Sequence, residues 1–155
     1  GLDIAGQPIG DPTALLAGVM VNPAAADLDR ELRRFEYKVE AGAEFVVTRP
    51  VFDVAAFERF LRRIEHLHIP VVAGLWPFDS ALNAEFMANE VPDVVVPVAL
   101  VERMRAATGA DGARREGAKI AAELLAALRP MTAGVVVSTP GGRVERALEI
   151  LSAAG

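Results

Sequence analysis

The hydrophobic residues of the chain gather in four short runs, which are separated by longer segments with helical spacing. The runs lie at residues 17–21, 45–48, 71–75 and 134–138, and each is almost continuously apolar rather than alternating. Continuous apolar runs of this length are typical of parallel strands that are buried on both faces of a sheet. The sequence therefore predicts four parallel strands, each covered on both sides.

Helical patterns lie between these runs. After the first run, Leu28, Leu32, Phe35 and Val39 form one apolar stripe, and Asp27 stands where its carboxylate can cap the start of the helix. The stripe predicts an amphipathic helix that packs against the sheet.

The other crossovers follow the same pattern. Asp53 can cap a helix after the second strand, and the third crossover is expected to hold three helices, at 81–88, at 97–107 and after a turn at 109–112, where Asp111 can act as the cap. A last helix is marked by Val144, Ala147, Leu148 and Leu151.

The alternation of strands and helices indicates an α/β protein, either a doubly wound sheet or a TIM (β/α)8 barrel. No Gly-x-Gly-x-x-Gly follows a strand, which disfavours a dinucleotide-binding Rossmann unit. A complete barrel has eight strands and about 250 residues, so four β/α units in 155 residues correspond to a half-barrel. Residues 1–6 read like the interior of a longer sequence, and we treat residues 1–155 as a single region of a larger protein.

Composition narrows the classes of function. Hydrophobic residues make up 52% of the chain, which indicates a packed core rather than disorder, and the net charge of −5 argues against nucleic-acid binding. The absence of cysteine excludes disulfides and thiolate metal sites, and with only His66 and His68 we expect no metal centre. The apolar runs are too short to span a membrane, so a cytoplasmic protein is expected.

In a barrel, functional residues follow the carboxyl ends of the strands. Arg49 directly follows a buried strand, where a charge needs a partner. Two interpretations stay open at this position: Arg49 binds an anionic or amide-bearing ligand, or it forms a structural ion pair with Asp53 or Asp79.

Two other strand-end loops also allow two interpretations. Gly141, Gly142 and Arg143 either hold a phosphate or carboxylate or form an ordinary glycine turn. The segment 76–78, Trp-Pro-Phe, either stacks on a flat ring or closes the interior. No nucleophile–base arrangement and no carboxylate pair can be assigned, so no catalytic residue is expected within this chain.

A longer motif resembles a known family. Residues 41–53, AGAEFVVTRPVFD, are similar to the AGA-(D/E)-F-x-x-T-Q-x-x-F-D signature of methylenetetrahydrofolate reductases. The segments 73–77, 83–87 and 142–145 resemble later parts of the same family, and the resemblance covers nearly the whole chain. Details within 34–38 and 83–86 look closest to bacterial proteins that join a homocysteine S-methyltransferase to such a reductase.

The resemblance implies a TIM barrel that holds FAD. Such an enzyme passes a hydride from NADH or NADPH to 5,10-methylenetetrahydrofolate and forms 5-methyltetrahydrofolate for one-carbon metabolism and methionine biosynthesis. Lys38 matches a lysine that contacts the FAD phosphates. Other positions that match cofactor-binding residues are Asn22, Glu31, Arg34 and Tyr37.

The resemblance also implies a folate site. Asn83 stands where many members have a folate-contacting glutamine, Arg143 matches an arginine that holds folate, and Phe86 or Met87 falls near an aromatic residue that packs on the substrate. Arg49 replaces a glutamine that contacts folate and nicotinamide. An arginine only donates hydrogen bonds and is always charged, so this substitution either changes the substrate, weakens the reaction or simply recruits an acidic neighbour.

The general acid and the flavin-facing aspartate of the family belong to the first half of the barrel. We therefore expect the isolated chain to be inactive and to pair with a missing N-terminal half-barrel or with another copy of itself, because open sheet edges favour pairing. The alternatives are a phosphate-binding barrel transferase or lyase, with Gly141–Arg143 as the anion site, and a non-catalytic half-barrel that serves binding or assembly.

Overall fold

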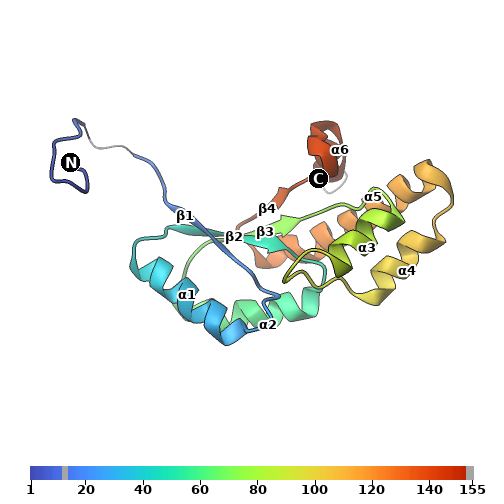
Figure 1. Ribbon diagram of the computed structural model, residues 1–155, viewed down its shortest axis with the longest axis horizontal. Helices are drawn as coiled ribbons and strands as arrows, with labels where there is room; N and C mark the ends of the chain where they lie inside the picture. Colours follow the sequence, from blue (N-terminus) through green and yellow to red (C-terminus); the bar gives the residue numbers. More distant parts are fainter. Residues whose placement is uncertain (12–13, 153–155) are drawn as a thin grey trace.

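The computed structural model describes residues 1–11 and 14–152 and contains one parallel sheet (Figure 1). Its strands are β1 (Gly18–Val21), β2 (Phe45–Pro50), β3 (Val71–Leu75) and β4 (Gly134–Val137). They pair in parallel in the order β1-β2-β3-β4. The four predicted parallel strands are thereby confirmed, and their consecutive order is the one that strands of a β/α barrel follow.

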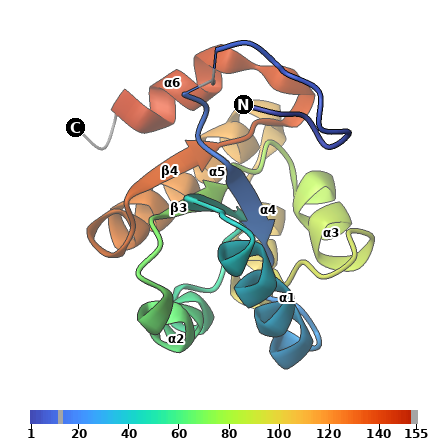
Figure 2. The same cartoon turned by 90° about the vertical axis from the view of Figure 1, so that its left-hand side faces the viewer.

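Helices connect the strands, and α1 and α2 lie on the same side of the sheet in both views (Figure 2). Three short 3₁₀ turns accompany the helices. The helices are α1 (Leu28–Glu40), α2 (Val54–Ile64), α3 (Ala81–Asn89), α4 (Val98–Ala106), α5 (Gly109–Leu128) and α6 (Val144–Ser152), and the 3₁₀ turns are η1 (Glu65–Leu67), η2 (Arg129–Met131) and η3 (Pro140–Gly142).

The predicted caps of α1 and α2 are confirmed. The side chain of Asp27 accepts a hydrogen bond from the backbone N–H of Arg30 at 2.9 Å, and that of Asp53 accepts one from Ala56 at 2.9 Å. Each carboxylate satisfies a backbone donor that has no partner within the helix and compensates the positive end of the helix dipole. These caps fix where each helix leaves the strand-end loop.

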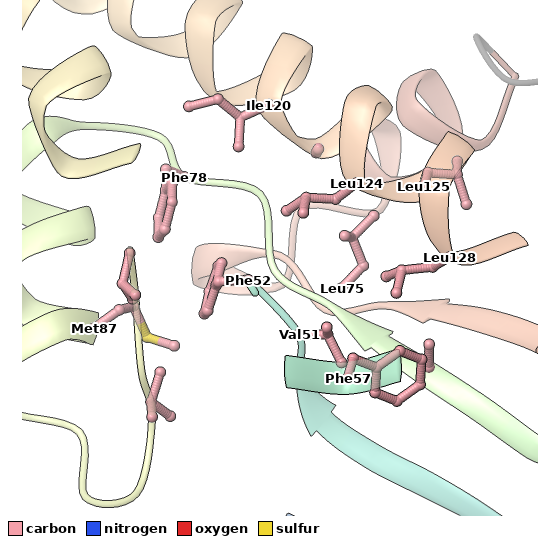
Figure 3. Packing of buried hydrophobic residues seen from close by; sticks show 14 of the residues in the cluster. Val51, Phe52, Phe57, Leu75, Phe78, Met87, Ile120, Leu124, Leu125 and Leu128 are labelled. Atoms are coloured by element: carbon pink, nitrogen blue, oxygen red, sulfur yellow. The ribbon is translucent and has the colours of Figure 1, made fainter. Parts of the chain in front are cut away.

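The core lies between the sheet and its helices (Figure 3). Phe52 and Phe78, from the loops after β2 and β3, stack with ring centroids 5.0 Å apart and an interplanar angle of 7°. Leu75 and Leu128 of the same core are also fully buried. Burying a side chain of this size contributes about 1.5–3 kcal/mol to the stability of the fold. The stacked rings therefore hold the two strand-end loops against the core.

The expected burial on both faces is met in the inner strand β3, where the consecutive residues Ala73, Gly74 and Leu75 are all buried, and is wrong for the edge strands β1 and β4. Val46, Ala73 and Leu75 are fully buried, whereas Met20 is 59% exposed and Val136 is 38% exposed. Successive strand residues point to opposite faces, so each edge strand has one face that is only partly covered. A continuous apolar run in the sequence cannot distinguish a strand with two covered faces from a strand with one exposed face.

Two helix starts and the buried face of the last helix differ from the sequence prediction. The turn expected at 109–112 is wrong, because α5 begins at Gly109 with Thr108 at the N-cap, and Asp111 lies in the first turn instead of capping the helix. Pro97 stands at the N-cap of α4, one residue before its first helical position. The final helix forms as predicted, yet Val144, Leu148 and Leu151 are exposed and Ile150 is the residue of α6 that is buried.

Within the described residues, no helix combines the length and the apolar character that crossing a bilayer requires.

Candidate functional site

The carboxyl ends of the four strands meet at one edge of the sheet, because the strands are parallel. Asn22 follows β1 directly, Arg49 lies near the end of β2, and the loops 76–80 and 139–143 follow β3 and β4. The structure thus places the strand-end residues along a single edge, where they form the candidate site.

Asn22, Glu31 and Arg34 form one connected group. Asn22 is buried, with 8% of its surface exposed, and its backbone N–H donates to Oε1 of Glu31 at 3.0 Å. Oε2 of Glu31 lies 3.7 Å from Nη1 of Arg34 on the next turn of α1. Glu31 therefore couples the end of β1 to the exposed guanidinium of Arg34.

Lys38 lies one turn further along α1 and reaches the edge strand. Its Nζ donates to the backbone oxygen of Met20 at 2.7 Å. Tyr37, on the neighbouring position of the helix, is 70% exposed. Arg34 and Lys38 are four residues apart, so they share a helix face and present two cations next to β1.

Two strand-end side chains hold one loop. Nη1 of Arg49 donates to the backbone oxygen of Pro92 at 2.9 Å, and Nδ2 of Asn22 donates to that of Asp93 at 2.8 Å. Asp93 has a left-handed backbone (φ 57°), which is unfavourable for a residue with a side chain. The loop between α3 and α4, residues 90–97, is therefore fastened across the ends of β1 and β2.

Of the two interpretations of Arg49, the ion pair with Asp53 or Asp79 does not form. Asp53 caps α2 instead, and Oδ2 of Asp79 lies 3.5 Å from Nη2 of Arg143. Arg49 satisfies its charge with a carbonyl oxygen, a contact that depends on where a distant loop passes. The Arg143–Asp79 pair joins the loop after β4 to the loop after β3.

Asn83 and Phe86 lie on α3. Oδ1 of Asn83 accepts a hydrogen bond from the indole N–H of Trp76 at 3.3 Å, and its backbone N–H donates to Oγ of Ser80 at 3.1 Å. Phe86 is 54% exposed, whereas Met87 is 5% exposed and packs in the core (Figure 3). Of these two neighbours, only Phe86 presents a side chain that a ligand can reach.

The aromatic segment after β3 has two different environments. Phe78 is fully buried against Phe52, so it closes the interior instead of stacking on a ligand. Trp76 is only partly buried and is fixed by its bond to Asn83. The interpretation of the segment as a ring platform therefore fails for Phe78.

Sequence reasoning missed the loop 90–97 as part of this site. A cavity of about 260 Å³ lies next to the ends of β1 and β2, and Val95 of this loop lines it together with residues 23–25, residues 50–53 and Arg59. The pair Pro92–Asp93 is a turn signal in the sequence, but nothing local indicates that the turn reaches two strands that lie far away along the chain.

The fold is that of an α/β protein with a parallel sheet, and its strand-end loops form the candidate site. The model of the family "Methylenetetrahydrofolate reductase" matches residues 3–138. The chain belongs to the methylenetetrahydrofolate reductase family, whose members are TIM barrels.

Individual relatives agree with this assignment. "Methylenetetrahydrofolate reductase (NADH) 1" of Arabidopsis thaliana and "Probable methylenetetrahydrofolate reductase (NADH)" of Oryza sativa subsp. japonica are each 29% identical over 82 residues. These residues are 52% of this chain and 14% of each relative, so the chain matches only a small part of the length of these proteins.

A solved structure shares the fold. It is described as "Uncharacterized protein from Clostridium thermocellum binds two copies of 5-methyl-5,6,7,8-tetrahydrofolic acid". The TM-score is 0.56 at 20% sequence identity, and the match covers 90% of this chain and 52% of the other. At this identity the likeness concerns the fold.

Proposed function

We propose that this chain forms the C-terminal half of a methylenetetrahydrofolate reductase barrel, which reduces 5,10-methylenetetrahydrofolate to 5-methyltetrahydrofolate with NADH or NADPH. The observation that supports this proposal most is the family match over residues 3–138, combined with one sheet edge that gathers Asn22, Arg49, Asn83 and Arg143. We further propose cytoplasmic one-carbon and methionine metabolism as its setting and a homocysteine S-methyltransferase as its fused neighbour.

The sheet supports the proposed half-barrel. β1 and β4 are edge strands, and an eight-stranded barrel closes only when four more strands join them. The match to about half of the solved folate-binding chain agrees with this division. In this proposal residues 1–155 act as one unit, pair with the other half-barrel or with a second copy, and are inactive alone.

The group around α1 fits the phosphates of FAD. Arg34 and Lys38 offer two cationic donors on one helix face, and Glu31 positions Arg34 and the backbone of Asn22. Guanidinium and ammonium groups bind phosphate oxygens through charge-assisted hydrogen bonds. When bound, FAD would supply the hydride relay between the nicotinamide and the folate, and the exposed side chain of Tyr37 would help to hold it.

The folate contacts come from α3 and from the loop after β4. Phe86 offers a partly exposed ring that can stack on a flat heterocycle, and Asn83 is held in place by Trp76 and Ser80. Arg143 can bind a carboxylate once it leaves its long contact with Asp79. We assign the packing role to Phe86, since Met87 lies in the core.

Arg49 serves a different purpose from the glutamine that it replaces. Its guanidinium donates to the carbonyl of Pro92 and so holds the loop 90–97 over the strand ends. Arginine lacks an acceptor, so Arg49 cannot copy both contacts of a glutamine. We propose that it shapes the entrance of the folate site through this loop.

The test is the visible absorbance of the chain after incubation with FAD and desalting. The proposal predicts a retained flavin band that Lys38→Gln and Arg34→Gln weaken and that Arg62→Gln, a change at an exposed arginine on α2, leaves unchanged. In the chain rejoined to the other half-barrel, bleaching of the band by NADH or by NADPH then identifies the donor. The absence of a flavin band from the chain and from the chain rejoined to the other half-barrel would contradict the proposal.

A further inference from the structure

Four arginines gather in a groove between α5 and α6. Figure 2 shows α6 passing across the end of the molecule where α5 lies behind it. The groove has a volume of about 410 Å³, and its charged lining consists of Arg114, Arg115, Arg143, Arg146, Glu145 and Glu149. Arginines outnumber glutamates by two to one here, although the whole chain has a net charge of −5.

Arg146 is the most unusual member of this group. Its Nη2 donates to the backbone oxygen of Arg114 at 3.0 Å, which directs the guanidinium toward α5. Its Nη1 is buried and has no hydrogen-bond partner among the described residues. A buried donor without a partner is costly, because it loses water and gains nothing in return.

The acidic residues nearby do not neutralise the groove. No ion pair in the described part of the chain involves Glu145, Glu149 or Arg115. Arg114 pairs at 3.1 Å with Asp111, whose side chain is 80% exposed, and Arg143 contacts Asp79 only at 3.5 Å. Arg115 is therefore without an ion-pair partner in the described part of the chain, and Nη1 of Arg146 is without a hydrogen-bond partner there.

We propose that this groove binds a ligand that bears at least two anionic groups, either phosphates or carboxylates. The planar guanidinium presents parallel N–H donors that match the oxygens of both groups. Nη1 of Arg146 is shielded from solvent, so a ligand that spans Arg115 and Arg146 would bond it once the Arg146 side chain turns toward the groove. Arg143 lines the groove and follows the strand-end loop, so the same ligand could be a free polyphosphate or the anionic extension of a molecule bound at the sheet edge.

Calorimetric titration of the 155-residue chain at low ionic strength tests the proposal, with inorganic pyrophosphate and citrate as probes. Arg115→Gln should weaken binding about tenfold, since it removes one charge-assisted contact from an exposed position without disturbing the core. Arg146→Lys should weaken it to a similar degree, because lysine keeps the charge but lacks the fork. Arg62→Gln, the matched control on α2, should leave the dissociation constant unchanged.

Binding of pyrophosphate alone would identify phosphate as the chemistry, and binding of citrate alone would identify carboxylate. Either result supports the groove, provided that Arg115→Gln weakens it and thermal unfolding shows the variant to be folded. The proposal is overturned when neither probe binds, or when Arg62→Gln weakens binding as much as Arg115→Gln does, which would show attraction to overall charge. Flavin retention does not involve this groove, so it should be equal in all three variants.

Discussion

Gly117 of α5 packs directly on the backbone of Phe78, so closely that a Cβ atom at residue 117 would overlap the Phe78 carbonyl oxygen. This contact sets the distance between α5 and the loop after β3. The same loop leads to Asp79, Ser80 and α3, which contribute to the candidate folate site. The position of the site therefore depends on a residue without a side chain.

Gly117→Ala should lower the free energy of unfolding by about 1–3 kcal/mol, because either the helix or the loop has to move to make room. Urea denaturation measures the change. Gly112→Ala, in the same helix, is the control. The nearest atom to the added Cβ, apart from its chain neighbours, would lie 3.9 Å away. This substitution should therefore leave stability unchanged or raise it by up to about 1 kcal/mol. Equal effects of the two substitutions would contradict the close packing.

Met87→Ala and Phe86→Ala should separate stability from binding. Met87 is buried, so its truncation leaves a cavity and should cost about 2–5 kcal/mol of unfolding free energy. Phe86 is 54% exposed, so its truncation should cost less than about 1 kcal/mol. Thermal unfolding checks both values, and a larger loss for Phe86→Ala would refute the assignment of Phe86 as the accessible side chain.

The loop 90–97 should open more often when either of its anchors is removed. Arg49→Gln loses the bond to Pro92, and Asn22→Ala loses the bond to Asp93. Each lost bond is expected to speed hydrogen exchange in this loop by about 3–10-fold, since one such bond contributes about 0.5–1.5 kcal/mol. Unchanged exchange in both variants would show that the loop is held by other contacts, and Arg62→Gln serves as the control.

Acid should weaken the ion pairs that connect α4 and α5. Arg103 contacts Glu123 at 2.6 Å and Glu116 at 2.7 Å. The hydrogen bond from Arg103 lowers the pKa of Glu123 below its usual value of 4.5. A carboxylate whose pKa is lower in the folded state stabilises the fold above its unfolded pKa, and this contribution disappears as pH falls from about 4.5 through the folded value.

The unfolding temperature of Arg103→Gln should therefore fall less steeply than that of the unchanged chain as the pH decreases through this acidic range. The difference should be small, because Glu123 is half exposed and solvent screens the pair. Thermal unfolding between pH 3 and pH 7, compared with Arg62→Gln, provides the measurement. An identical pH profile for both variants would mean that the pair contributes nothing.

Local signals predicted much of the fold. The strands follow from apolar runs, and the starts of α1 and α2 follow from Asp27 and Asp53, since a cap acts on a backbone group only three residues away. The beginning of α5 was missed because Thr108 and Asp111 are both acceptable caps. Thr108 has the extended backbone of an N-cap residue, whereas Asp111 already lies within the first helical turn.

The contacts of the site were harder to predict. Arg49 is 43 residues away from Pro92, and Asn22 is 71 residues away from Asp93. Such bonds depend on the path of a loop, which no local pattern encodes. The exposure of Met20 and Val136 was also beyond a pattern of apolar residues, because it depends on what lies opposite the sheet.

Equilibrium binding of 5-methyltetrahydrofolate to the FAD-treated chain tests the central claim most directly. The account predicts binding that Arg143→Gln and Asn83→Ala each weaken about tenfold and that Arg62→Gln leaves unchanged. A chain that retains FAD yet does not bind the folate, or binds it equally well in all three variants, would contradict a folate site at this edge of the sheet.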